Sequence, residues 1–141
     1  MVRKEIWRYE FGKCYGCKRK THNYLGMTLD YTTPKKVKLK MKEYIKQMIK
    51  EYPEEIKGSK YPWNDNLFKQ DDKSDKLGKE RAELFHTLVA KGLFLSKRAR
   101  PDILPAITYL CTRVKEPNES DWFKLSKVIG FLKSTMNDEL T

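Results

Sequence analysis

Two cysteines and a histidine near the N-terminus have the residue types of a zinc site and part of its spacing. Cys14 and Cys17 form a C-x-x-C pair, and His22 follows five residues later. A structural zinc ion takes four ligands, and the other candidates, His86 and Cys111, lie far along the chain in segments with helical patterns. A thioredoxin-like redox pair is disfavoured because no β–α–β pattern surrounds it. A metal role for the first three residues stays open, and the odd cysteine count favours reduced thiols.

A pair of adjacent carboxylates, Asp71 and Asp72, suggests metal-ion chemistry at first sight. Phosphoryl transfer by two metal ions, however, needs a cluster of preorganised carboxylates. The pair lies in a lysine-rich polar segment with no third ligand or general base nearby, and the sequence places no nucleophile beside His86. We therefore predict solvated carboxylates and an ordinary helix-surface or core-edge histidine, and we assign neither a metal site nor a catalytic residue in this chain, with the role of Cys14, Cys17 and His22 left open.

Five lysines are placed for a different chemistry, the neutralisation of phosphate charge. Across residues 37–42 lysines alternate with apolar residues, which is the period of a half-buried strand. From Lys42 the apolar period becomes helical, and lysines recur four residues apart on another face of the expected helix. A lysine face of this kind is most often merely solvated, so both interpretations are open at this point. These residues, called the lysine stripe below, are Lys38, Lys40, Lys42, Lys46 and Lys50.

The chain of 141 residues carries a formal charge of +11, and this charge is unevenly distributed. Residues 1–60 hold 16 Lys and Arg against 7 Asp and Glu, whereas residues 61–141 hold 14 against 12. Such a field attracts a polyanion, with nucleic acid as the first candidate and an anionic membrane as the second. No apolar run approaches the roughly 18 residues that span a bilayer, and the first residues lack the apolar core of a signal peptide. We expect an intracellular protein, cytoplasmic or nuclear, that is neither secreted nor held in a membrane.

The N-terminal elements that must position these residues are predicted to be strands. Aromatic and aliphatic runs alternate there with turn residues such as glycine and proline. We therefore expect a short antiparallel β-hairpin or sheet in this part of the chain. The expected strands are 6–11, 24–31 and 37–41, and the expected turns are 12–20 and 32–36.

The remainder is predicted to be a helical bundle, which makes the expected fold class α+β. The small residues Gly92 and Ser96 would let a neighbouring helix approach closely, and Asn118 or Ser120 is suited to cap the last helix. An irregular connection over 54–78 is expected to be held down by Tyr61, Trp63, Leu67 and Phe68. The expected helices begin at Lys42 and cover 79–97, 101–114 and 118–134, with inward residues that include Ile45, Met48, Tyr52, Phe85, Leu88, Ile103, Ile107, Leu110, Val114, Trp122, Leu125, Val128, Ile129 and Leu132.

Four blocks of the sequence, in order, resemble the later part of the reverse transcriptase of copia-like LTR retrotransposons. In that family a Y/F-L-G motif is followed by a helix, an R-P-D block and a Y-L-K-G-T block. The set is more specific than any one block, and it covers nearly the whole chain. The blocks are HNYLGM, KLKMKEYIKQMIKEYP, ELFHTLVAKGLFLSKRARPDI and DWFKLSKVIGFLKST.

The resemblance implies an organisation and a partner. Residues 1–41 would form the end of the polymerase palm with its primer-grip hairpin, and residues 42–141 the thumb and connection region. The lysine stripe would lie along an RNA/DNA hybrid or duplex DNA and hold its phosphates without reading sequence. Further implied partners are the palm and fingers upstream and the RNase H segment downstream in a full polyprotein. The implied primer grip contains Tyr24, Leu25, Gly26 and Met27.

The chain departs from the family pattern in its catalytic parts. It has no Y-x-D-D motif, and the chain ends about six residues after FLKST, the block that precedes RNase H in the family. FLKST also lacks the family's glycine, and Ala99 stands where the family usually has threonine. The resemblance therefore implies a non-catalytic fragment, with Mg²⁺ needed only by the complete polymerase.

Two other hypotheses stay open at this point. The chain could be a self-contained nucleic-acid enzyme, either a nuclease or a polymerase active in trans, or an expressed retroelement remnant without a function. Magnesium-dependent turnover abolished by Asp71→Asn with Asp72→Asn would favour the enzyme. Loss of binding in the combined charge reversal of Lys42, Lys46 and Lys50 would favour the binding module.

Overall fold

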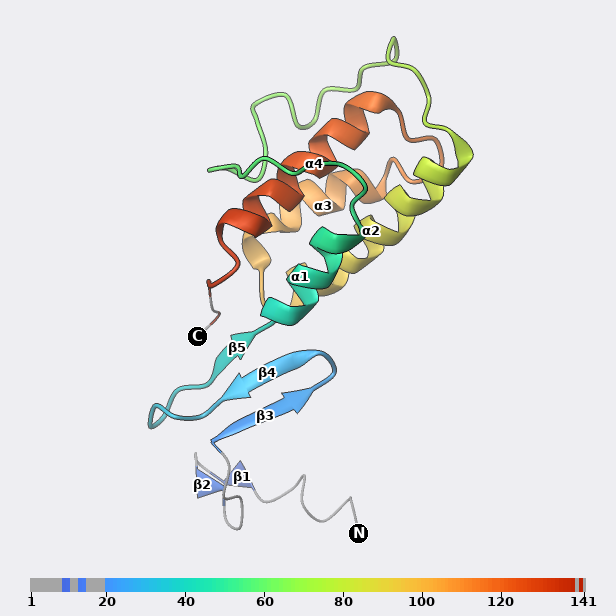
Figure 1. Ribbon diagram of the computed structural model, residues 1–141. Coiled ribbons are helices and arrows are strands. Elements are labelled where there is room, and N and C mark those ends of the chain that lie inside the picture. Colours follow the sequence, from blue (N-terminus) through green and yellow to red (C-terminus); the bar gives the residue numbers. More distant parts are fainter. Residues whose placement is uncertain (1–8, 11–12, 15–19, 139, 141) are drawn as a thin grey trace.

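The computed structural model describes residues 9–10, 13–14, 20–138 and 140 of the chain. In this described part, antiparallel strands near the N-terminus are followed by four packed helices, which confirms the predicted α+β class. Figure 1 shows the three-stranded sheet at one end of the helical bundle, joined to it where β5 runs into α1.

Two small antiparallel sheets make up the strand region. β1 (Tyr9–Glu10) pairs with β2 (Lys13–Cys14), and the second sheet has the order β3 (Thr21–Tyr24), β4 (Met27–Asp30) and β5 (Lys38–Lys40). The strand expected over 6–11 is described only at β1. The turn expected over 12–20 is wrong at β2, because the backbone there pairs with β1.

The register of the three-stranded sheet separates an apolar face from a polar one. Leu29 lies opposite His22 in β3 and opposite Leu39 in β5, so these three side chains share a face. The alternation along β5 places Lys38 and Lys40 on the other face, as predicted.

The strand expected over 24–31 is wrong, because a tight turn divides it. Leu25 and Gly26 connect β3 to β4 with positive φ angles of 48° and 77°. Positive φ at both central residues is the geometry of a type I′ turn, whose twist matches that of the paired strands. The usual sequence signal for this turn is Asn-Gly, and here Leu25 occupies the position of the asparagine, so the signal is missing. The turn expected over 32–36 does lie in the next connection, between β4 and β5.

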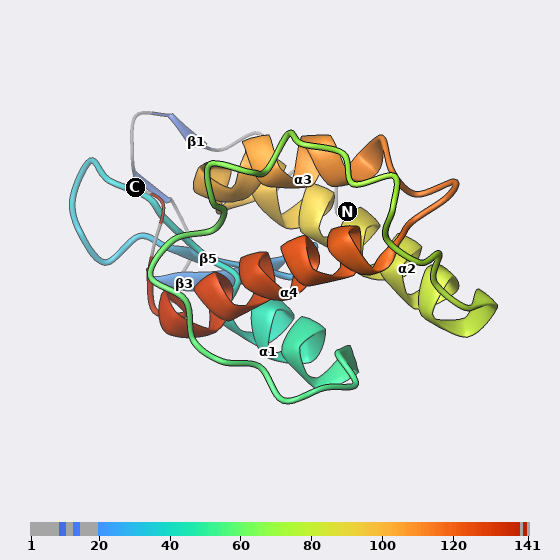
Figure 2. The same ribbon diagram turned by 90° about the horizontal axis from the view of Figure 1, so that it is seen from above.

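The helices pack in a bundle with α4 in its middle. The α2 helix packs against α3, and α4 packs against both α1 and α3. In the view from above, α4 lies between α1 and α3 (Figure 2). None of the described helices is long and apolar enough to cross a membrane. The elements are α1 (Lys42–Glu51), α2 (Lys79–Arg98), the 3-10 helix η2 (Pro101–Ile103), α3 (Leu104–Cys111) and α4 (Glu119–Ser134).

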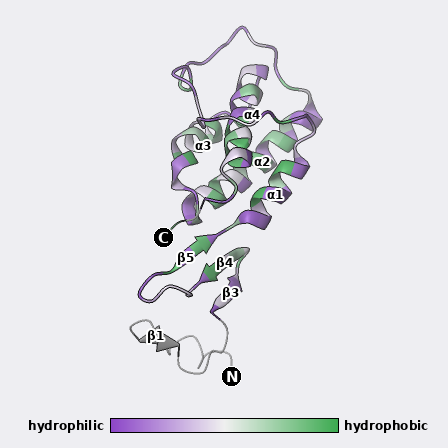
Figure 3. Cartoon of the chain, turned by 60° about the vertical axis from the view of Figure 1, so that its left-hand side comes forward, coloured by the Kyte–Doolittle hydropathy of each residue, from purple (hydrophilic) through white to green (hydrophobic). Residues whose placement is uncertain are grey.

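The helices enclose one apolar core, which contains most of the residues predicted to face inward. Phe85, Leu110 and Leu125 are completely buried, and Figure 3 shows apolar and polar residues alternating along the helices. A side chain on Gly92 would meet Ile107 at 2.6 Å. The prediction of a close helix approach at this small residue is therefore confirmed.

The helix expected over 101–114 differs from the structure at both ends. It begins as η2, becomes α-helical only at Leu104 and ends at Cys111. Pro105 has no N–H, so one continuous α-helix from Pro101 would lack a hydrogen bond at that position. Because α3 starts afresh at Leu104, Pro105 occupies a first-turn position where no such bond is needed.

The connection between α1 and α2 is irregular, as predicted, and two of its predicted anchors are confirmed, since Leu67 is buried and Trp63 packs against the core. Tyr61 is 62% exposed, so the prediction is wrong for this residue, and Phe68 is 68% exposed with only an edge-on contact to Tyr109, at 5.7 Å between ring centroids. Ile56 is the anchor that the sequence did not reveal, since it is 8% exposed and its carbonyl accepts a hydrogen bond from Lys133 at 3.0 Å.

Candidate nucleic-acid interface

Helix α1 buries one side and presents lysines on another. Ile45 and Met48 are each 1% exposed and belong to the core. Lys42 and Lys50 are exposed, and Lys46 between them is partly exposed. Because residues four apart lie on the same face of a helix, these three lysines form a row along the outside of α1.

The strand lysines of the stripe are tied into the sheet. Lys40 Nζ lies 3.3 Å from Asp30 Oδ2, and Lys38 lies opposite Asp30 across the strand pair. Thr32 donates to the Asp30 carboxylate from its hydroxyl at 2.7 Å and from its backbone N–H at 2.9 Å. These hydrogen bonds, with a smaller contribution from Lys40, lower the pKa of Asp30 to about 2. Asp30 is therefore ionised at neutral pH and offsets part of the positive charge of β5.

The three helix lysines all act on the carboxylate of Glu43. Lys46 Nζ lies 2.9 Å from Glu43 Oε1, and this hydrogen bond, with the fields of Lys46, Lys42 and Lys50, lowers the pKa of Glu43. Within the described part of the chain, Lys42 and Lys50 form no ion pair. Sequence reasoning overlooked Glu43, although its spacing of three residues from Lys46 is that of a helix ion pair.

The predicted primer-grip residues lie at the hairpin turn, against α1. Tyr24 and Leu25 are each 60% exposed, and Met27 packs at the edge of the core. A Cβ atom added to Gly26 would lie 3.8 Å from Cδ2 of Tyr44 in α1. The fold therefore brings the hairpin turn next to the helix that carries Lys42.

Leu25 is a strained residue at this turn. Its φ of 48° lies in the left-handed region, which costs a residue with a side chain roughly 1–2 kcal/mol. The exposed side chain gains little from packing that could offset this cost. Strained residues concentrate at functional sites, so the conformation is a reason to look for a role at this turn.

The adjacent carboxylates form part of a local turn. Asp71 accepts hydrogen bonds from the Ser74 hydroxyl at 2.7 Å and from the Lys73 backbone N–H at 3.1 Å. These bonds lower the pKa of Asp71, and Asp72 is exposed beside it. No group of three or more potential metal ligands occurs among the described residues.

The cysteine and histidine candidates are not brought together where the structure describes them. Cys17 and the side chain of Cys14 lie outside the described residues. His22 is half-buried on the apolar face of the sheet, and His86 is exposed on α2. Cys111 is half-buried in α3, where burial raises the pKa of its thiol.

Two of the blocks that carry the resemblance meet in the structure, at Arg100. Its guanidinium is almost completely buried and makes two hydrogen bonds to Asp102, at 3.1 and 2.8 Å. It also donates to the Thr135 carbonyl at 2.9 Å and to the Thr135 hydroxyl at 2.6 Å. The R-P-D block is thereby joined to the FLKST block, and Arg100 has a structural role.

Comparisons with known proteins were made at three levels. No family model, no curated protein and no solved structure matches the chain. The resemblance to copia-like reverse transcriptases therefore stays a prediction, and the interface depends on the residues and contacts described above.

Proposed function

We propose that this chain binds double-stranded nucleic acid, either duplex DNA or an RNA/DNA hybrid, through its phosphates. The binding surface is the lysine row on the outside of α1, and the hairpin turn meets α1 at Tyr44, on another side of the helix. In this proposal the chain is a non-catalytic palm-end and thumb region of a retroelement reverse transcriptase, and it grips the template–primer duplex without base readout.

The observation that carries the proposal is the row of cations on the outside of α1, two of which form no ion pair with any residue that the structure describes. Lys42 and Lys50 are eight residues apart, which is about 12 Å along a helix axis. Phosphates of one DNA strand follow one another at about 3.4 Å along the duplex axis. The row therefore has the length of three to four phosphates.

Two further features support the proposal. The half of the chain that contains this surface holds 16 Lys and Arg against 7 Asp and Glu, so long-range attraction favours a polyanion there. The contact between Arg100 and Thr135 gives the R-P-D and FLKST blocks a common structural reason to occur together. If the chain has the thumb fold of that family, residues that hold two of its segments together should occur in both blocks, as Arg100 and Thr135 do.

The proposal is tested by fluorescence anisotropy with a short labelled DNA duplex and the matching RNA/DNA hybrid. We expect Lys42→Glu combined with Lys50→Glu to weaken binding roughly tenfold or more at low ionic strength. This variant leaves the Glu43–Lys46 ion pair in place, so the charge of α1 changes without the loss of that contact.

The matched control is Lys73→Glu combined with Lys79→Glu. Both lysines are exposed and form no ion pair within the described residues, and the change in net charge is the same. We expect little loss of affinity from this control. Equal losses in the two double variants would mean generic attraction, and no loss in either would remove α1 from the binding surface.

A further inference from the structure

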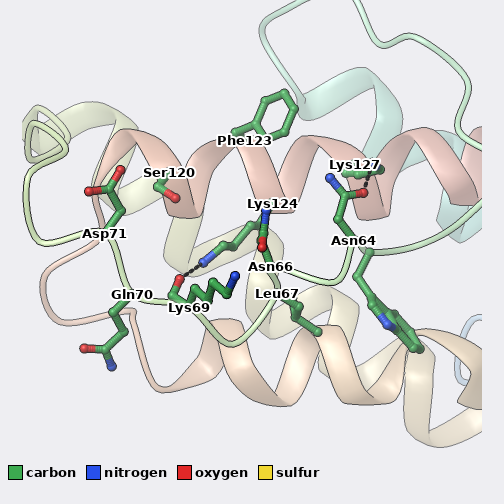
Figure 4. Close-up of a pocket in the computed structure, with 11 residues that line it drawn as sticks. Asn64, Asn66, Leu67, Lys69, Gln70, Asp71, Ser120, Phe123, Lys124 and Lys127 are labelled. Carbon is green, nitrogen blue, oxygen red and sulfur yellow. Dashed lines mark hydrogen bonds between the residues drawn. The ribbon is translucent and has the colours of Figure 1, made fainter.

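A cavity of about 400 Å³ lies between α4 and the long connection that precedes α2. Four α4 residues line it, namely Ser120, Phe123, Lys124 and Lys127. Their spacing of three and four residues places them on one face of the helix. Residues 63–71 of the connection form the opposite wall (Figure 4).

The wall formed by the connection combines hydrogen-bonding and apolar groups. Asn64, Asn66 and Gln70 contribute amides, which can both donate and accept hydrogen bonds. Leu67 is buried and Trp63 is half-buried, so they fix this wall against the core. The amide side chains therefore lie on a segment of backbone that Leu67 and Trp63 hold against the core.

The cavity has an excess of positive charge. Lys124 donates to the Lys69 carbonyl at 2.7 Å, and Lys127 is hydrogen-bonded to the side chain of Asn64. Among the described residues, neither these two lysines nor Lys69 forms an ion pair. Asp71 is the one carboxylate in the lining, and its oxygens are engaged within its own turn. An anionic group would meet three cations there.

An uncovered aromatic ring stands at the same place. Phe123 is 62% exposed and lies in the second turn of α4. Figure 4 shows the ring on the side of α4 that points away from the connection, so it offers a stacking surface at the rim of the cavity, near the lysines of α4.

We propose that this cavity is a nucleotide subsite. The base stacks on Phe123 at the rim of the cavity, and the phosphate is held by lysines of the lining, Lys69 and Lys127. The cavity volume lies within the range of small-molecule sites, about 300–1,000 Å³. The nucleotide can be a free mononucleotide or one unit of a single strand, and both offer the same base and phosphate.

The subsite is separate from the proposed duplex surface. It is formed by α4 and the connection, whereas the lysine stripe belongs to β5 and α1. Lys42→Glu with Lys50→Glu should leave mononucleotide binding unchanged. Failure of one proposal is therefore distinguishable from failure of the other.

The test is a calorimetric titration of the full chain with AMP, with ribose 5-phosphate as the ligand that lacks a base. We expect saturable binding of AMP and about tenfold weaker binding of ribose 5-phosphate, because stacking is lost. A single-stranded oligo(dA), titrated in parallel, identifies the source. If oligo(dA) binds more tightly per site than AMP, the natural ligand is a single strand. If oligo(dA) binds more weakly, the natural ligand is a free nucleotide.

Matched variants locate the site. We expect Phe123→Ala to weaken AMP binding about tenfold and Phe123→Tyr to restore it, without a change in melting temperature because the ring is exposed. Lys69→Gln should weaken AMP binding about threefold. Lys73→Gln, an equal charge change in the same connection outside the cavity, should have no effect.

Two results would overturn the subsite. One is the absence of saturable binding of both AMP and oligo(dA). The other is binding that Phe123→Ala and Lys69→Gln leave unchanged, or that ribose 5-phosphate reproduces in full.

Discussion

At the scale of single residues, Glu43 controls how much positive charge the outside of α1 presents. Its side chain is 84% exposed, and it pairs with Lys46 at 2.9 Å. Lys42 and Lys50 also lower its pKa through their fields. A carboxylate in this position competes with a phosphate for the Lys46 ammonium, so its removal should strengthen binding if α1 is the binding surface.

We expect Glu43→Gln to bind a labelled DNA duplex about two- to fivefold more tightly than the parent chain at low ionic strength. Glu116→Gln is the matched control, since Glu116 is 73% exposed, pairs with Lys76 at 3.4 Å and lies in the loop before α4. Anisotropy titrations measure both. A tighter complex from both variants alike, or a weaker one from Glu43→Gln, would contradict the role given to α1.

Tyr52, at the end of α1, has a buried hydroxyl without a hydrogen-bond partner among the described residues. Its ring stacks on Trp122 with centroids 5.1 Å apart, and the neighbouring Ser126 hydroxyl donates to the Phe123 carbonyl instead. Burial, and to a lesser degree the Glu54 carboxylate, raises the pKa of Tyr52 from 10.0 to about 12. Folding therefore favours the neutral phenol. This stability is present below pH 10 and is lost as the pH rises towards 12.

Tyr52→Phe should be as stable as the parent chain at pH 7, or slightly more stable, because it removes a buried unpaired hydroxyl. Between pH 10 and pH 12, the parent should lose on the order of 1–2 kcal/mol more unfolding free energy than the variant. Urea unfolding followed by circular dichroism measures both. Tyr24→Phe, at a 60% exposed position, should show the same pH dependence of the unfolding free energy as the parent chain. If Tyr52→Phe also showed the parent's pH dependence, the loss of stability could not be assigned to Tyr52.

At the scale of elements, Arg100 joins the start of η2 to the end of α4. It is 3% exposed and bonds to Asp102 and to both oxygens of Thr135. The charge is buried, so each bond replaces hydration that the guanidinium has lost. Loss of these contacts should loosen the end of α4 and with it the bundle.

We expect Arg100→Ala to lower the unfolding free energy by about 2–4 kcal/mol, because it leaves Asp102 and Thr135 without their partner. Arg100→Lys should recover only part of this loss, since an ammonium cannot reproduce the planar fork of the guanidinium. Lys97→Ala, at an exposed position of the same segment, should change stability by less than about 0.5 kcal/mol. Urea titration distinguishes them, and an Arg100→Ala chain as stable as Lys97→Ala would exclude the structural role.

Helix α4 shows why the helical part was largely predictable from sequence. Asn118 accepts a hydrogen bond from the Asp121 N–H at 2.9 Å, and Asp121 accepts one from the Asn118 N–H. This capping box is local, so its residue types mark the helix start. Leu125 and Ile129 follow the helical period and are buried, as predicted. Local signals of this kind do not depend on the rest of the fold.

The hairpin and the cavity show where prediction from sequence ended. Leu25 adopts a positive φ that its residue type disfavours, so the turn had no clear sequence signal. The subsite combines Phe123 with Lys69, which lie on different elements, and a pattern within one element cannot place two elements beside each other. The partner of Lys40, Asp30 on the neighbouring strand, likewise became visible only with the contacts.

At the scale of the whole molecule, the excess positive charge lies in the half that contains the strands and α1. In the helical part, cations pair across elements. Arg81 joins Glu54 at 2.9 Å and Glu119 at 2.7 Å, and Arg113 joins Asp121 at 3.1 Å. The excess positive charge therefore belongs to the half of the sequence that contains the strands and α1, and a polyanion should be attracted to that half.

This distribution predicts how salt should act on duplex binding. The logarithm of the binding constant should fall linearly with the logarithm of the salt concentration, with a slope of about −0.9 for each neutralised phosphate. Lys42→Glu with Lys50→Glu should reduce the magnitude of the slope by about two, and Lys73→Glu with Lys79→Glu should leave it unchanged. A duplex of scrambled sequence should give the same slope as the original, because phosphates carry no sequence information. If the α1 variant kept the full slope, other residues would hold the phosphates, and the duplex would have to be placed elsewhere on the molecule.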